Sequence, residues 1–326
     1  MKVAMLSGNL IKSSVVIVGT VMLPVCNTLL ISDAVAITLF VFVILESVLL
    51  CLAVIYIRQM IKKSQKSVSI NNEEKTGFLF ETAYEQHIGT RKTQQDSVFV
   101  DASNDNRVLG IVCDGMGGMS HGEAVSRLTV ERFSEAFRNL TSYENIPDFF
   151  CKQAEILDKE IYNYPGASNG KGSAGTTLCA VVALKDIFYW VSIGDSRIYL
   201  LRDGRLDLLT HDQNYRMKLE EMVESGTITK EQAEIDPQQD ALINYIGIGN
   251  LTMLEFNPSG SGLYHDDIIL ICSDGLTRSL TEDIIGRIMT QYSNNLTDAA
   301  HILTMTAFDS SYTSQDNTSI VLIKYN

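Results

Sequence analysis

The chain has 326 residues, enough for one large domain with an accessory segment, and its ordinary apolar and charged content excludes a wholly disordered protein. The net charge of −13 is uneven, because residues 1–66 carry +4 and the rest of the chain therefore carries −17. So acidic a body repels nucleic acid, which excludes a nucleic-acid partner. The six cysteines lie far apart without CxxC spacing, which argues against a disulfide framework or a structural zinc site.

Two long apolar runs, residues 15–31 and 34–57, open the chain and are separated by only two residues. The second run is long enough to cross ~30 Å of hydrocarbon, and the first reaches the lower limit. Residues 1–57 are therefore predicted to form a membrane anchor, a hairpin of two transmembrane helices. Four basic residues follow between positions 58 and 66, so the positive-inside rule predicts a multi-pass protein of the cell membrane whose body is cytoplasmic. Cleavage of the first run as a signal peptide near Ala36 stays open as an alternative.

A polar stretch without periodicity, residues 58–76, predicts a linker to a body over residues 77–326. Within the body, runs rich in β-branched and aromatic residues predict strands. They cover residues 78–85, 97–101, 108–113, 176–184, 187–193, 197–201, 205–209, 268–271 and 318–324. Apolar residues at helical spacing predict helices at residues 123–140, 148–162, 215–225, 282–290 and 297–308.

Tight turns join several of the predicted strands. One example is Asp203-Gly204, which lies between the strands at 197–201 and 205–209. Short connections of this kind link antiparallel strands, whereas parallel strands need a long crossover. The body is therefore predicted to be α+β, with antiparallel sheets and packed helices, rather than a doubly wound parallel sheet.

Five aspartates recur at the ends of predicted strands. Asp114, Asp195 and Asp274 close apolar strands, whereas Asp96 and Asp316 precede them. A carboxylate beside a buried strand loses hydration unless something pairs with it, and few basic residues lie near these positions in the sequence. Five such carboxylates suit hard divalent cations, which prefer oxygen ligands. The combination predicts a two-metal site that activates a water and binds the oxygens of a phosphate ester, although an Asp-Gly pair alone also indicates a turn.

Six short motifs follow one another over about 240 residues, from Ile88 to the C-terminus. They are RKTQQD at 91–96, DGMGG at 114–118, GTT at 175–177, GDSR at 194–197, SDGL at 273–276 and DN at 316–317. In these motifs the chain resembles the PPM family, the type-2C metal-dependent Ser/Thr protein phosphatases, in its bacterial form. The resemblance implies a four-layer αββα sandwich of two antiparallel sheets flanked by helices. It also implies phosphorylated proteins as substrates, made by a Ser/Thr kinase.

The resemblance further implies two Mn²⁺ or Mg²⁺ ions, with a third ion as in bacterial members, and it assigns their ligands. Asp114 would bridge the two ions, and the Gly115 carbonyl would complete the second site. Asp274 and Asp316 would hold the first ion. Asp195, together with Asp274, would hold the third.

The same resemblance assigns catalytic roles to three residues. Asp114 would act through the ions that it bridges, Asp96 through a bound water, and Arg91 would bind the substrate phosphate. Residues 213–250 resemble the family's flap, a segment beside the active site.

Three positions depart from the family pattern. Gln94 replaces the usual Asn of the first motif, which we expect to change only local packing. Gln95 stands where some members have Glu, so a charge beside the metal ligands is missing. Met116 stands where eukaryotic members have His, so a histidine general acid is absent at that place, as is usual in bacterial members.

Two other functions remain as alternatives. Cys272 and Arg278 have the C-x5-R spacing of cysteine-dependent phosphatases, but no His precedes the Cys and Asp274 would place a negative charge in the anion cradle. The apolar run before Cys272 also predicts a buried thiol with a raised pKa, which disfavours a thiolate nucleophile. A pseudophosphatase that binds phosphoproteins without hydrolysing them would be favoured by loss of metal ligands, yet all the aspartates are present.

Overall fold

The computed structural model describes residues 79–103, 106–116, 121–164 and 174–326. The predicted anchor (1–57) and linker (58–76) lie outside these residues. Within the described ranges, no helix combines the length and apolarity needed to cross a membrane. The described residues belong to one compact unit, which runs from Gly77 to Asn326.

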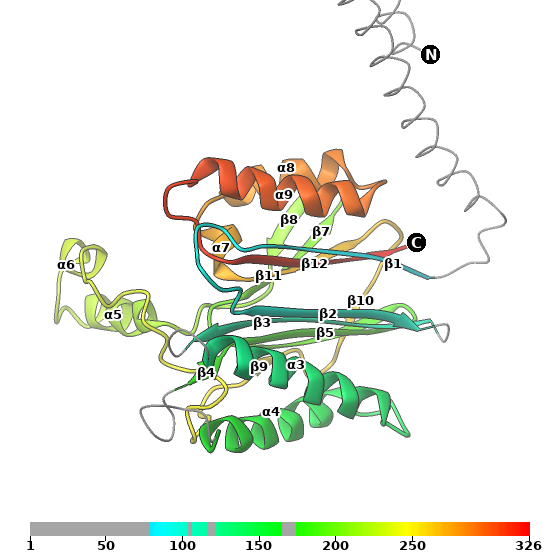
Figure 1. The fold of residues 1–326 in the computed structure, drawn as a ribbon, viewed down its shortest axis with the longest axis horizontal. Helices are drawn as coiled ribbons and strands as arrows, with labels where there is room; N and C mark the ends of the chain where they lie inside the picture. The colour runs from blue at the N-terminus through cyan, green and yellow to red at the C-terminus, as the bar shows by residue number, and fades with distance from the viewer. Residues whose placement is uncertain (1–78, 104–105, 117–120, 165–173) are drawn as a thin grey trace, which may run out of the picture. The chain divides into compact units, whose positions relative to one another are not determined.

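Two antiparallel sheets form the centre of this unit (Figure 1). The first sheet has the strand order β1 (Phe80–His87), β12 (Thr318–Tyr325), β11 (Ile268–Cys272), β7 (Arg197–Arg202) and β8 (Arg205–Leu208). The second has the order β10 (Ser261–Gly262), β6 (Ile187–Ile193), β5 (Leu178–Leu184), β3 (Arg107–Met116) and β2 (Asp96–Ser103). The short strands β4 (Gly175–Thr176) and β9 (Glu255–Phe256) pair with β3 and β6.

Helices cover the outer faces of both sheets. Figure 1 shows α3 (His121–Arg138) and α4 (Ile146–Tyr162) below the second sheet, and α8 (Glu282–Gln291) and α9 (Leu296–Ser310) above the first. This arrangement confirms the predicted α+β class, with two antiparallel sheets flanked by helices.

Strand β3 shows why the sequence folds into these layers. Its residues point alternately to opposite faces. Leu109 and Ile111 pack with the helix residues Phe133 and Phe150, while Val112 packs in the core between the two sheets. A strand that is buried on both faces needs apolar residues at nearly every position, and therefore reads as a continuous apolar run. On the far side of the first sheet, α8 and α9 close a third core.

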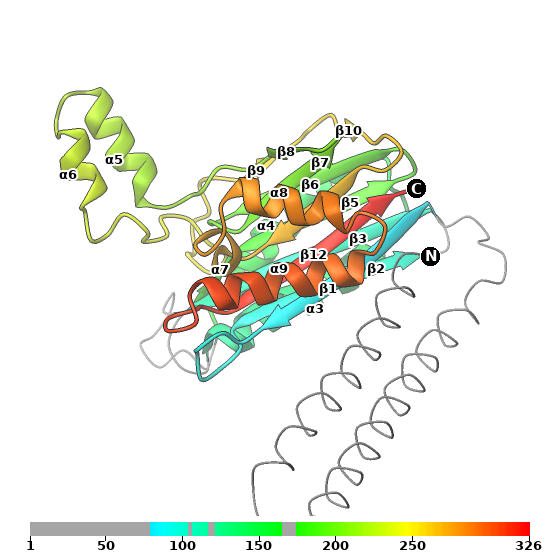
Figure 2. The same ribbon diagram turned by 90° about the horizontal axis from the view of Figure 1, so that it is seen from above.

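A pair of short helices, α5 (Tyr215–Glu224) and α6 (Lys230–Glu234), lies within the predicted flap segment 213–250. Figures 1 and 2 both show this pair projecting from the end of the sandwich where α7 (Asp274–Thr277) lies. Thr229 forms a capping box with Gln232, which explains how five residues suffice to form α6. The elements α6, α7, β9 and β10 were not predicted from the sequence, because each is too short to show a periodic pattern.

Candidate active site

Strand register brings the first two aspartates together. In the antiparallel pair β2–β3, Asp96 lies directly opposite Asp114. Facing residues in such a pair have Cβ atoms about 4.5–5.5 Å apart, so two carboxylates meet where like charges repel. Asp114 lies within β3, which continues to Met116, and the expectation that it closes the strand is therefore wrong.

The remaining aspartates come from the first sheet and from the crossover between sheets. Asp274 is the first residue of α7, just after β11, and Asp316 lies two residues before β12, the partner strand of β11. Asp195 lies in the turn that leads from β6 of the second sheet to β7 of the first. It is two residues beyond the end of β6, rather than at the strand end as expected. The layered topology thus gathers residues from both sheets at one end of the sandwich.

Glycines allow the backbone segments that carry these aspartates to approach one another. A Cβ at Gly115 would lie 2.1 Å from the carbonyl oxygen of Gly122, so the end of β3 contacts the first turn of α3 only without a side chain there. A Cβ at Gly275 would lie 2.0 Å from the carbonyl oxygen of Asn317. The Asp-Gly pairs therefore serve close packing of the site as well as its chemistry.

Burial and mutual repulsion raise the pKa of four of the aspartates. Burial is the largest cause for Asp96, whose pKa is raised to about 7, and repulsion from Asp274 and Asp316 adds to it. Burial followed by repulsion from Asp274 raises the pKa of Asp195 to about 7. The pKa of Asp114 is raised well above its usual range, by burial and then by the other four aspartates. Burial also raises the pKa of Asp274, against the opposing effect of Arg278.

Two buried carboxylate oxygens of the cluster, Asp96 Oδ1 and Asp274 Oδ1, have no hydrogen-bond donor. A buried acceptor without a donor is costly, and a cation is the group that would satisfy several such oxygens at once. The donor set, which consists of carboxylates and backbone carbonyls, suits Mn²⁺ or Mg²⁺ rather than a soft metal. In their chemistry, these donors therefore fit the divalent ions that the sequence predicts.

As they stand, no three acidic, histidine or cysteine side chains of the described chain converge closely enough to hold one ion. Two arginines instead form ion pairs within the cluster. Arg91 Nη2 lies 2.5 Å from Asp316 Oδ2, and Arg278 Nη2 lies 2.7 Å from Asp274 Oδ2. The sequence predicts few basic residues near these carboxylates, and the fold adds two arginine partners: Arg91 from a distant segment and Arg278 from one helical turn away.

Hydrogen bonds from the motifs hold the aspartates in place. The backbone N–H of Asp114 donates to Thr177 Oγ1 at 2.8 Å, and Thr176 Oγ1 donates to the Asp114 carbonyl at 2.8 Å. Ser273 Oγ donates to Asp96 Oδ2 at 2.8 Å. Gln94, one of the departures from the family pattern, accepts the backbone N–H of Asp96 through its side-chain oxygen at 3.2 Å. The GTT motif thus supports the site from β4 and from Thr177, which lies between β4 and β5.

The family model for Protein phosphatase 2C matches residues 85–307 of this chain. The chain belongs to this family. Among similar proteins, serine/threonine phosphatase stp of Listeria welshimeri is 29% identical over 239 residues, covering 72% of this chain and 92% of that protein. Protein phosphatase PhpP of Streptococcus pneumoniae is 27% identical over 242 residues, covering 73% of this chain and 95% of that protein.

Solved structures of the protein phosphatase 2C type agree with this assignment. The serine/threonine phosphatase of S. agalactiae has a TM-score of 0.66 and 28% identity, covering 76% of this chain and 100% of that chain. The catalytic domain of PstP in complex with 2 manganese ions has a TM-score of 0.60 and 25% identity, covering 75% of this chain and 97% of that chain. The chain is therefore a protein serine/threonine phosphatase.

The cysteine-dependent alternative is not favoured within this protein phosphatase 2C fold. Cys272 is fully buried at the end of β11, and burial raises the pKa of its thiol to about 12. A thiolate nucleophile needs the opposite, an exposed position and a lowered pKa. Arg278 pairs with Asp274 rather than forming an empty anion cradle.

Beside the aspartate cluster, a cleft of about 410 Å³ extends toward the flap segment of the phosphatase. Both carboxylates and guanidinium groups line this cleft. The carboxylates belong to Asp195, Asp212, Asp240 and Asp274, and the guanidinium groups to Arg197, Arg216 and Arg278. Asp212 was not predicted from the sequence to take part in the site. In the structure it binds Arg197 of the GDSR motif through two hydrogen bonds of 2.8 Å and adds to the repulsion on Asp195. In the sequence, only the short distance between His211-Asp212 and the GDSR motif could have suggested the ion pair of Arg197 with Asp212.

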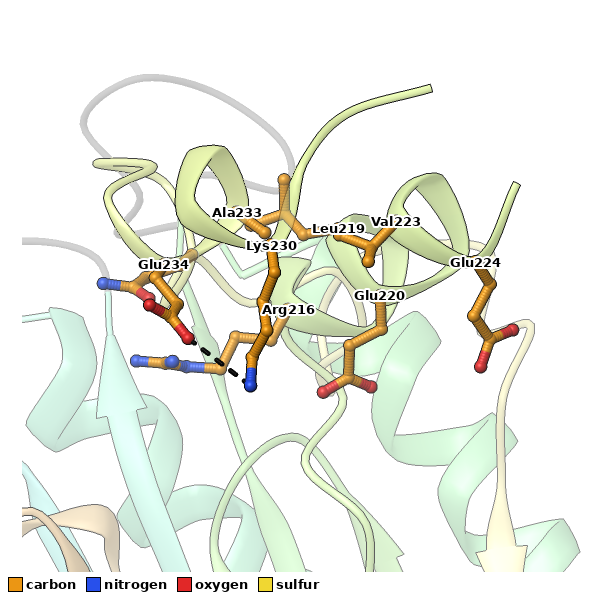
Figure 3. A pocket seen from close by; sticks show the side chains of 9 residues that line it. Arg216, Leu219, Glu220, Val223, Glu224, Lys230, Ala233 and Glu234 are labelled. Carbon is orange, nitrogen blue, oxygen red and sulfur yellow. Dashed lines mark ion pairs between the residues drawn. The ribbon is translucent and has the colours of Figure 1, made fainter. Parts of the chain in front are cut away.

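A second cleft, of about 420 Å³, lies between α5 and α6 of the flap segment. Figure 3 shows the apolar side chains of Leu219, Val223 and Ala233 between the two helices. Charged side chains extend below them, including Lys230, which forms an ion pair with Glu234 at 3.8 Å. None of these three apolar residues belongs to the main cores.

Proposed function

We propose that this protein is a metal-dependent, membrane-anchored phosphatase that hydrolyses phosphoserine and phosphothreonine in proteins. The observation that carries the proposal is the group of buried and half-buried aspartates, which repel one another and contain carboxylate oxygens without donors. Such a group stabilises the fold only when cations bind to it. The manganese ions in the related PstP structure support the same chemistry.

The aspartates of the site would have different roles in metal binding. Asp114 would bind both ions, the Gly115 carbonyl would bind the second, and Asp274 and Asp316 would bind the first. Asp96 would hold a coordinating water through its free Oδ1. When bound, Mn²⁺ or Mg²⁺ would supply an activated water and would offset the charge of the phosphate. A third ion would bind at Asp195 together with Asp274.

Arg91 would bind the substrate phosphate. Its guanidinium is more than half exposed and reaches into the cluster to Asp316. Once Asp316 is committed to a cation, the guanidinium would be free to bind two phosphate oxygens at once. Substrate binding by Arg91 would therefore depend on prior occupation of the aspartate cluster.

A phosphothreonine peptide provides the test of this function. The purified protein should release phosphate with Mn²⁺ or Mg²⁺, stop in EDTA, and be indifferent to a thiol alkylator. Undiminished turnover in EDTA would contradict metal dependence, and loss of activity with the alkylator would revive Cys272. Metal binding without hydrolysis of any phosphopeptide would favour the pseudophosphatase alternative.

The membrane part of the proposal rests on the two apolar runs within residues 1–57 and on the basic residues that follow. A phosphatase body on the cytoplasmic side would reach proteins phosphorylated by a Ser/Thr kinase. A reporter fused to the C-terminus should score as cytoplasmic, and the full chain should sediment with membranes. Removal of residues 1–57 should shift the protein to the soluble fraction, whereas a C-terminus outside the cell would refute the topology.

A further inference from the structure

Arg278 stands one helical turn after Asp274, at the C-cap of α7. Its backbone N–H donates to the Asp274 carbonyl at 2.9 Å, and its guanidinium binds the Asp274 carboxylate at 2.7 Å. Asp274 is largely buried, with 12% of its side chain exposed, whereas 49% of the Arg278 side chain is exposed. The pair therefore joins a fixed carboxylate to a cation that has room to move.

The surroundings of Arg278 are acidic on several sides. Besides Asp274, the carboxylates of Asp195, Asp240 and Asp316 all attract its guanidinium. Three of these four aspartates are the ligands assigned above to divalent ions. Arg278 thus sits among carboxylates that a metal ion would also bind, and it neutralises part of their charge.

We propose that Arg278 is a built-in competitor of the divalent ion at Asp274, and that it weakens metal binding there by occupying the carboxylate in the metal-free protein. The inference rests on the metal dependence in the proposed function. It adds a residue outside the ligand set that controls how much free metal the phosphatase needs.

The geometry of the pair makes displacement the expected response to metal. Asp274 Oδ2 is bound to Arg278 and Oδ1 has no donor, so a cation that uses this carboxylate would lie beside the guanidinium. Two positive groups so close repel each other. The guanidinium can withdraw, because Arg278 lines the cleft of about 410 Å³ and its side chain is half exposed.

A supporting role for Arg278 predicts the opposite result. If the guanidinium held the Asp274 carboxylate in the orientation that an ion needs, its removal would weaken metal binding. Competition instead predicts tighter binding when the arginine is removed. The sign of the change in affinity therefore distinguishes the two roles.

Calorimetric titration of Mn²⁺ into the full-length, metal-stripped protein tests the inference. We expect Arg278→Ala to lower the Mn²⁺ dissociation constant about 3- to 30-fold, which corresponds to ~0.7–2 kcal/mol at ~1.4 kcal/mol per tenfold change. The Mn²⁺ dissociation constant of Arg278→Lys should lie between those of the native protein and of Arg278→Ala, because an ammonium retains the charge but cannot form the planar contact. Added salt should narrow the difference, since it screens exposed charges.

Two arginine variants serve as controls. Arg205→Ala removes an Arg–Asp pair of similar length, 2.8 Å, from the β7–β8 hairpin and lowers the net charge equally. Arg216→Ala removes a 2.7 Å pair with Asp240 from the same cleft. Neither pair includes a proposed metal ligand, so we expect both variants to bind Mn²⁺ within about twofold of the native protein. An equal tightening in either control would show a general charge effect and would overturn the inference.

Thermal unfolding gives a second readout that does not depend on activity. Arg278→Ala should unfold at a lower temperature than the native protein in EDTA, because the carboxylates lose a counter-ion, but should gain more from saturating Mn²⁺. Unchanged or weaker Mn²⁺ binding by Arg278→Ala, with normal binding by the native protein, overturns the competition alone. Failure of the native protein to bind Mn²⁺ overturns the proposed function and this inference together.

Discussion

Replacement of Asp96 by asparagine tests whether the metal-free aspartate cluster is under electrostatic strain. Asp96 is 4% exposed, and burial raises the pKa of its carboxyl to about 7, with repulsion from Asp274 and Asp316. In an unfolded chain an aspartate titrates near ~3.9. Because its pKa is higher in the folded state, ionised Asp96 destabilises the fold at high pH, and this destabilisation is relieved as the pH falls from ~7 toward ~4.

The size of the effect follows from these two pKa values. The interval between ~3.9 and about 7 corresponds to ~4 kcal/mol at ~1.36 kcal/mol per pKa unit. Because several aspartates share the repulsion, we expect Asp96→Asn to recover about half of this energy near pH 8, which is a gain of ~2 kcal/mol in the free energy of unfolding. The asparagine oxygen can still accept the Ser273 hydroxyl, which donates to Asp96 at 2.8 Å. Near pH 5.5, where wild-type Asp96 is largely protonated, the gain should fall to ~1 kcal/mol.

Thermal unfolding in EDTA at both pH values measures this gain. A stabilisation of ~2 kcal/mol should raise Tm by about 4–8 °C for a domain of this size. Asp101→Asn is a matched control on the same strand, because its half-exposed carboxylate faces solvent near Arg138. It should change stability by less than ~0.5 kcal/mol. An Asp96→Asn protein that is no more stable than wild type in EDTA near pH 8 would refute the idea that the cluster is strained.

The remaining predictions concern catalysis, measured as steady-state hydrolysis of a phosphothreonine peptide. Asp274→Asn should lower kcat by ~1000-fold or more, because activation of the attacking water depends on the ions, and near-normal turnover would exclude Asp274 as a ligand. Arg91→Ala should lower kcat/KM about 10- to 1000-fold with little change in metal affinity, and Arg91→Lys should recover only part of the loss, since each ~1.4 kcal/mol is a factor of ten. If Arg91→Ala left kcat/KM unchanged, the phosphate would be bound elsewhere. Cys272→Ser should retain most activity, and an inactive but folded variant would restore the cysteine mechanism.

Most helices and strands of the phosphatase body could be predicted from the sequence, because burial of one or both faces leaves a pattern of apolar residues in it. The predicted strand 187–193 coincides with β6, and the helix predicted at 215–225 differs from α5 by one residue. The break that separates β4 from β5 at Thr177, whose side chain accepts the backbone N–H of Asp114, left no such pattern. Likewise, α7 covers four residues and follows from the close packing of Gly275 against Asn317.

The sequence by itself determined which residue types the site contains and in what order they occur, because carboxylates beside apolar strands stand out against local composition. Which of them meet was decided by the tertiary structure. Ser273 and Asp96 are 177 positions apart and Arg91 and Asp316 are 225 apart, and only sheet pairing and the crossover between sheets bring them into contact. Charge balance is a property of the assembled site rather than of any segment. For this reason the roles of Arg91 and Arg278 as counter-ions became visible only in the fold.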